Sequence, residues 1–110
     1  MADIADTIRE TVEQNKVVLF MKGSKNFPQC GFSARAVEIL KKSGVAFKDV
    51  NVLSDPALRQ GIKDFSQWPT VPQIYVGGKF LGGSDILLEM FESGELKKTL
   101  EAAGALEAAK

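Results

Sequence analysis

The residue with the greatest chemical potential in this chain is Cys30, the only cysteine among 110 residues. It follows the apolar run Val17–Met21 and a loop that carries Lys22 and Lys25, and it precedes a segment with helical periodicity. A helix N-terminus offers unpaired N–H groups and partial positive charge, and nearby lysines add to that charge. Both effects favour the thiolate, which is the nucleophilic and metal-binding form. The pattern predicts a reactive thiol; the alternative is a small buried hydrophobic residue.

Several kinds of chemistry are excluded by composition. The chain contains no histidine, which rules out a histidine-based triad, a Cys–His dyad and a histidine-ligated metal site within it. A single cysteine cannot form an intramolecular disulfide, which suits a reducing compartment. The formal net charge is zero, so nothing global predicts binding to nucleic acid or to an anionic membrane.

No membrane or export segment is expected from the sequence. The longest strongly apolar run, Val17–Met21, is far too short to span a bilayer. The acidic start, Met1–Asp6, lacks the basic and apolar regions of a signal peptide. We therefore expect a bacterial cytoplasm, or an organellar matrix or stroma if a transit peptide has been removed.

Two further loops carry candidate binding groups. Proline at position 72 forces extended backbone before it, and freed main-chain groups of Val71 could pair with an extended peptide. Gly82-Gly83 permits close approach of a ligand to the backbone, and the N-terminus of a helix starting near Ser84 would bind a carboxylate. The alternative is that Ser84 is an ordinary N-cap and that the Asp85 carboxylate interacts favourably with the helix dipole.

Basic residues offer a second carboxylate site. Lys22 and Arg59 are the candidates, although a solvated charge is the commoner fate of a single Lys or Arg. Trp68 is expected to be a packing residue. Taken together, the residues predict a thiol beside a groove for a small extended peptide with a carboxylate at each end, and glutathione has that description.

The elements that would position these groups alternate along the chain. Helical periodicity, caps and proline predict helices, and β-branched runs with a Gly77-Gly78 turn predict strands. The helices are expected over residues 3–15, 30–43, 55–67 and 84–104, with a break at Gly94, and the strands over residues 17–21, 46–52, 73–76 and 79–81. This order predicts one α/β domain over residues 1–110, a four-stranded mixed sheet with helices on both faces, and an alanine-rich tail that frays.

Four motifs in this order resemble the monothiol glutaredoxins of the CGFS type. The resemblance covers about residues 4–100 and rests on Met21-Lys22-Gly23, Cys30-Gly31-Phe32-Ser33, Trp68-Pro69-Thr70-Val71-Pro72 and Gly82-Gly83-Ser84-Asp85. It implies a thioredoxin-like fold with a cis proline at Pro72. It also implies a glutathione site formed by Lys22, Arg59, Thr70, Val71, Pro72, Gly83, Ser84 and Asp85.

The resemblance further implies that Cys30 is a ligand of a [2Fe-2S] cluster together with the thiol of glutathione. Such a cluster usually needs four thiolates, and this chain has one cysteine. Two protomers and two glutathiones would complete the set, so a homodimer is expected with the cluster and a monomer without it. Many relatives have a cysteine where this chain has Ser84, so an oxidised Cys30 would need an external thiol here.

Three functions follow from the resemblance. The first is a carrier that transfers the cluster to acceptor proteins in iron–sulfur cluster biogenesis and iron and redox homeostasis. The second is a glutathione-dependent thiol–disulfide oxidoreductase that deglutathionylates proteins through Cys30 alone. The third is an adaptor that pairs with a BolA-like protein through the cluster.

Overall fold

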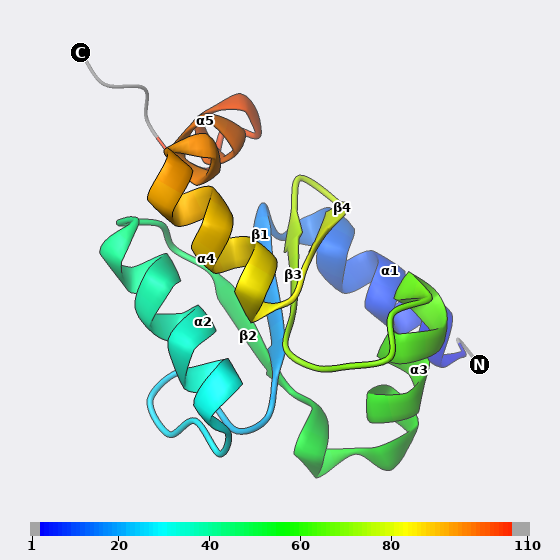
Figure 1. The fold of residues 1–110 in the computed structure, drawn as a ribbon. Coiled ribbons are helices and arrows are strands. Elements are labelled where there is room, and N and C mark those ends of the chain that lie inside the picture. Colours follow the sequence, from blue (N-terminus) through cyan, green and yellow to red (C-terminus); the bar gives the residue numbers. More distant parts are fainter. Residues whose placement is uncertain (1–2, 107–110) are drawn as a thin grey trace.

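A computed structural model describes residues 3–106 of the chain, and its elements occur in the predicted order (Figure 1). The helices are α1 (Ile4–Gln14), α2 (Gly31–Lys42), α3 (Pro56–Ser66), α4 (Ser84–Ser93) and α5 (Glu95–Ala102), with a short 3₁₀ turn η1 (Val52–Ser54). The strands are β1 (Val17–Met21), β2 (Lys48–Asn51), β3 (Gln73–Val76) and β4 (Lys79–Gly82). The end of the alanine-rich tail, residues 107–110, lies outside the described residues.

The four strands form one mixed sheet in the order β2-β1-β3-β4, as predicted. The β1 and β2 strands are parallel and are joined through α2, whereas β1 pairs with β3, and β3 with β4, in antiparallel fashion. All five residues of β1 are buried. A central strand covered on both faces has this uniform apolar character instead of an alternating one.

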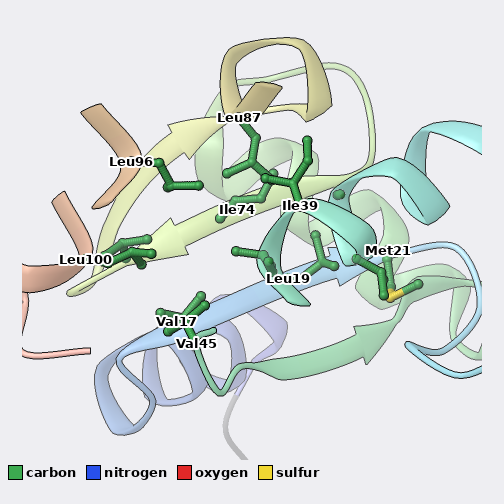
Figure 2. Packing of buried hydrophobic residues seen from close by; sticks show 13 residues of the cluster. Val17, Leu19, Met21, Ile39, Val45, Ile74, Leu87, Leu96 and Leu100 are labelled. Carbon is green, nitrogen blue, oxygen red and sulfur yellow. The ribbon is translucent and has the colours of Figure 1, made fainter. Parts of the chain in front are cut away.

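Helices cover both faces of the sheet (Figure 1). Because successive strand residues point to opposite faces, β1 contributes to two separate cores. Val17, Leu19 and Met21 belong to the core under α2, α4 and α5, which Figure 2 shows from close by. Val18 and Phe20 belong to the core under α1 and α3.

The second strand is shorter than predicted. It ends at Asn51, whose side-chain Oδ1 accepts from the N–H of Leu53 at 2.9 Å and from the N–H of Gly23 at 3.0 Å. The first of these bonds turns the chain into η1, because an Asn side chain can hydrogen-bond to the backbone two residues on. The second ties this turn to the loop that precedes Cys30.

Candidate functional site

The loop before the thiol is closed by one hydrogen bond and anchored to β2 by another. The N–H of Gln29 donates to the carbonyl of Lys22 at 2.9 Å, and the N–H of Lys25 donates to Asp49 Oδ2 at 2.9 Å. Gly23 has φ of 91°, which favours glycine, and a Cβ there would lie 2.5 Å from the Phe27 carbonyl oxygen. The tight turn therefore delivers Cys30 to the start of α2 in one defined place.

Cys30 is the N-cap of α2, as the sequence predicts, and it is only partly buried. The main-chain N–H of Ser33 is the largest influence on the thiol and lowers its pKa. Partial burial raises the pKa, and the N–H of Phe32 and the charge of Lys22 lower it further. The net direction is downward, so the helix start favours the thiolate.

Lys25 acts differently from the sequence-based expectation, and Ser33 ties the loop to the helix start. Lys25 does not contribute to the lowered pKa of Cys30; its Nζ lies 5.4 Å from the ring centroid of Phe47. Ser33 is fully buried, and its Oγ accepts from the N–H of Lys22 at 3.1 Å. This bond joins the end of β1 to the first turn of α2, so the thiol and Lys22 are positioned together.

A pocket of about 510 Å³ opens beside Cys30, within the range of about 300–1,000 Å³ that is usual for small-molecule sites. The fold brings all the residues predicted for the site to its wall: Lys22, Cys30, Arg59, Thr70, Val71, Pro72, Gly83, Ser84 and Asp85. They come from the loop that follows β1, from the start of α2, from α3, from the connection before β3 and from the start of α4. The remaining lining residues are Phe32, Lys63, Trp68, Pro69 and Ile86.

The connection between α3 and β3 forms one wall of the pocket. The Val71–Pro72 peptide bond is cis, as the resemblance implied. Among the hydrogen bonds of residues 3–106, none engages the main-chain N–H or carbonyl of Val71. Trp68 packs against Phe80 with ring centroids 5.8 Å apart, as expected, but it also lines the pocket.

The start of α4 forms another part of the wall. The helix starts at Ser84, as expected, and Gly83 is its N-cap, so the alternative in which Ser84 is an ordinary N-cap is wrong. Gly83 has no side chain to accept from the first-turn N–H groups, which therefore remain without a side-chain partner. Asp85 is exposed, and its Oδ1 lies 3.9 Å from Arg35 Nη1.

Positive charge on the pocket wall comes from Lys22, Arg59 and Lys63. Within residues 3–106, none of these cations has a carboxylate within 4.0 Å. Lys63 was missed by the sequence reasoning. The signal was its position four residues after Arg59, which places two side chains on the same side of a helix.

The chain alone does not form a metal centre in the part that the structure describes. No group of three or more His, Cys, Asp or Glu side chains within residues 3–106 could hold a metal ion. A [2Fe-2S] cluster needs four thiolates, and Cys30 is partly exposed and can supply one. The donor set therefore fits a cluster whose other three ligands come from outside the chain.

None of the helices in residues 3–106 is long and apolar enough to cross a membrane.

Comparison with known proteins identifies the family. A family model described as Glutaredoxin matches residues 17–81. Monothiol glutaredoxin-S14, a chloroplastic protein of Arabidopsis thaliana, is 54% identical over 100 residues, which are 91% of this chain and 58% of that protein. The chain thus spans less than two thirds of this relative. An uncharacterized ycf64-like monothiol glutaredoxin of Synechocystis is 53% identical over 96 residues, which are 87% of this chain and 90% of that protein.

The fold is also found among solved structures. A crystal structure of a buckwheat glutaredoxin–glutathione complex superposes with a TM-score of 0.84 and covers 94% of this chain and 92% of the other. Its 24% sequence identity shows a common fold alone. With a thioredoxin-like fold, a matching family model and monothiol relatives at more than half identity, the chain belongs to the glutaredoxin family.

Proposed function

We propose that this chain binds glutathione in the pocket beside Cys30, and that two such complexes share a [2Fe-2S] cluster for delivery to acceptor proteins. The observation that carries the proposal is the chemistry of one pocket. Within residues 3–106 it combines a thiol of lowered pKa, three cations without carboxylate partners, unpaired main-chain groups at Val71 and an uncapped helix start.

Glutathione offers a complementary group to each of these features. The unpartnered cations would bind the glycyl carboxylate, with Arg59 and Lys63 on consecutive turns of α3. The free main-chain groups of Val71 would pair with the cysteinyl backbone as an added strand does. The first-turn N–H groups of α4, at Ser84 and Asp85, would hold the γ-glutamyl carboxylate, and the Asp85 carboxylate would hold the ammonium group.

In this proposal the cluster is cargo. Cys30 would supply one thiolate and glutathione another, so that two protomers complete the four ligands of a [2Fe-2S] centre. Half of the ligands would then be exchangeable small molecules, which suits transfer better than permanent electron transport. The proposed macromolecular partners are iron–sulfur acceptor proteins and a BolA-like protein in place of the second protomer. A reducing compartment, cytoplasmic or organellar, would keep both thiols available.

The lowered pKa of Cys30 favours a second candidate function, protein deglutathionylation. The Cys30 thiolate would attack the glutathione sulfur of a mixed disulfide, forming a Cys30–glutathione disulfide and releasing the protein thiolate. The thiolate of a second glutathione would attack that disulfide. Glutathione disulfide would leave, and the Cys30 thiolate would be regenerated. Since the described chain has no other thiol, this external step is obligatory.

Anaerobic reconstitution with iron, sulfide and glutathione tests the main proposal. The expected product absorbs in the visible range, elutes at dimer size and does not form without glutathione or with Cys30→Ser. A colourless monomer that rapidly deglutathionylates a model substrate would favour the second function instead. Cluster binding that persists in Cys30→Ser would show that the assigned ligand is wrong.

A further inference from the structure

One polar side chain lies directly behind the pocket wall. Gln73, the first residue of β3, is completely buried and does not line the pocket. Its Nε2 donates to the carbonyl oxygens of Trp68 at 3.3 Å and of Thr70 at 3.1 Å. Its Oε1 accepts from the hydroxyl of Tyr75 at 3.4 Å. A buried amide is costly unless it is hydrogen-bonded, and these three bonds satisfy it.

The two bonds from Nε2 shape the connection that precedes β3. Both acceptors, Trp68 and Thr70, lie in the segment that lines the pocket, and the amide draws their carbonyls towards the protein interior. The N–H of Trp68 is held separately by Ser66 Oγ at 3.1 Å. Val71 follows directly and is left without a main-chain hydrogen bond within residues 3–106. The internal hydrogen bonds of the segment are therefore made by residues that precede Val71, whose own main-chain groups remain free within residues 3–106.

We propose that Gln73 is a positioning residue for extended peptide ligands: it holds the segment over residues 68–71 in the conformation that presents Val71 to the pocket. The inference rests on the proposed function, because it supposes that a peptide such as glutathione pairs with Val71. If the amide were removed, the carbonyls of Trp68 and Thr70 would lose their donor. They would turn towards other donors, and the ligand would then have to reorder the segment upon binding.

A pair of variants separates this role from general packing. Gln73→Met keeps the length of the side chain and removes both donors, whereas Tyr75→Phe removes only the hydroxyl that bonds to Gln73 Oε1. Isothermal titration with reduced glutathione should give a dissociation constant raised roughly tenfold or more for Gln73→Met. For Tyr75→Phe, the constant should stay within about twofold of that of the unaltered chain, since a single long bond is lost.

A second readout shows that the thiol itself is intact. The rate of Cys30 alkylation by neutral iodoacetamide depends on the N–H groups of Ser33 and Phe32 at the start of α2, so it should be unchanged in both variants. Equal glutathione affinity of Gln73→Met and the unaltered chain would overturn this inference alone. Failure of the unaltered chain to bind glutathione would overturn the proposed function as well.

The unaltered chain provides a test that does not depend on the folding of a variant. By linkage, a ligand whose binding requires the hydrogen bonds from Gln73 to the Trp68 and Thr70 carbonyls must also stabilise those bonds. Saturation with glutathione should therefore slow hydrogen exchange of the Gln73 side-chain amide, as followed by NMR. The amide of Gln60, which donates to the exposed Asp64 Oδ1 at 3.0 Å, is the control and should be unaffected. Unchanged exchange at Gln73 upon saturation would overturn the role.

Discussion

The helices on the two faces of the sheet begin in different ways. On one face, Asp3 accepts from the N–H of Asp6 at the start of α1, and Asp55 accepts from the N–H groups of Ala57 and Leu58 at the start of α3. On the other face, the N-cap residues of α2 and α4 are Cys30 and Gly83, and neither makes a side-chain cap hydrogen bond. At the capped helix starts, side chains of the protein accept from first-turn N–H groups. At the uncapped starts, the first-turn N–H groups have no side-chain acceptor.

The difference marks where the molecule uses helix starts for chemistry. A side-chain cap typically contributes about 1 kcal/mol, so α2 and α4 forgo stability at their N-termini. Both of these N-termini line the pocket. The start of α5 at Gly94 is also uncapped but does not line the pocket. The missing cap is therefore informative only together with the pocket. At α2 the N–H groups lower the pKa of a thiol, and at α4 they lack a side-chain acceptor and are available to the anion of the proposed function.

The largest expected effect comes from capping α4. Gly83 has φ of −95°, and a Cβ there would meet the Pro72 carbonyl oxygen at 3.4 Å, an ordinary contact. Gly83→Asp would place a carboxylate on the first-turn N–H groups. We expect glutathione binding to weaken more than about tenfold, because like charges compete for one site, and stability to rise by only a few tenths of a kcal/mol. Calorimetric titration and thermal melting measure the two effects.

Gly83→Asn is the matched control for that change. Asn caps a helix about as well as Asp but carries no charge, so its effect on glutathione affinity should be smaller. Unaltered affinity of Gly83→Asp would mean that the start of α4 does not bind a carboxylate. It would also mean that the difference between capped and uncapped helix starts has no bearing on ligand binding at α4.

The opposite change removes a cap from the other face. Asp55→Ala should lower the free energy of unfolding by about 1 kcal/mol, because two N–H groups lose their acceptor. Denaturant unfolding measures the loss, and Asp55→Asn should restore most of it. Glutathione affinity should stay close to that of the unaltered chain. A loss of binding without a loss of stability would contradict a purely structural role for this cap.

A smaller effect is expected from Lys63. Lys63→Gln removes one of the cations on the pocket wall, so glutathione affinity should fall a few-fold at low salt and less at high salt, because partly exposed charges are screened. Titrations at two ionic strengths measure the effect. Lys97→Gln, an exposed change on α5 away from the pocket, is the control. If the two variants behave alike at low salt, Lys63 does not contact the ligand.

The smallest effect concerns the pH dependence of the thiol. The rate of Cys30 alkylation should have its midpoint below the ordinary cysteine pKa. Lys22→Gln should raise that midpoint modestly, because the N–H groups of Ser33 remain the largest influence, and Lys25→Gln should leave it unchanged. Alkylation rates measured across pH provide the test, and a shift with Lys25→Gln would contradict the placement of Lys25 over Phe47.

The same lowered pKa affects stability in one direction. Between the folded pKa and the ordinary value of about 8.5, the folded chain binds fewer protons than the unfolded chain, so the thiolate contribution grows as pH rises and is lost as pH falls through the folded pKa. The stability difference between the unaltered chain and Cys30→Ser should therefore increase with pH across this window. A flat difference in denaturant unfolding would show that the helix start does not favour the thiolate.

Sequence reasoning succeeded where neighbours in the chain decide the outcome. Asp55-Pro56 predicts a helix start because both act within one turn, and Cys30 was placed correctly at the start of α2. It was wrong where the end of an element depends on a hydrogen-bond partner far away in the chain or on a neighbouring residue that takes the cap position. Asn51 ends β2 early by bonding to Leu53 and also to the distant Gly23. Gly83 takes the cap position that the alternative interpretation gave to Ser84.

The sequence by itself determined the order of the elements, the single thiol at a helix start, and the residue types that a glutathione site requires. These depend on periodicity, capping and composition, which are local properties of the chain. Only the tertiary structure decided that Lys63 joins Lys22 and Arg59, that Lys25 lies over Phe47, and that Gln73 supports the pocket wall. Each of these depends on contacts that form only when the helices pack against the sheet. Hydrogen bonds and close charge interactions depend on the distance between groups in space, whatever their separation along the chain.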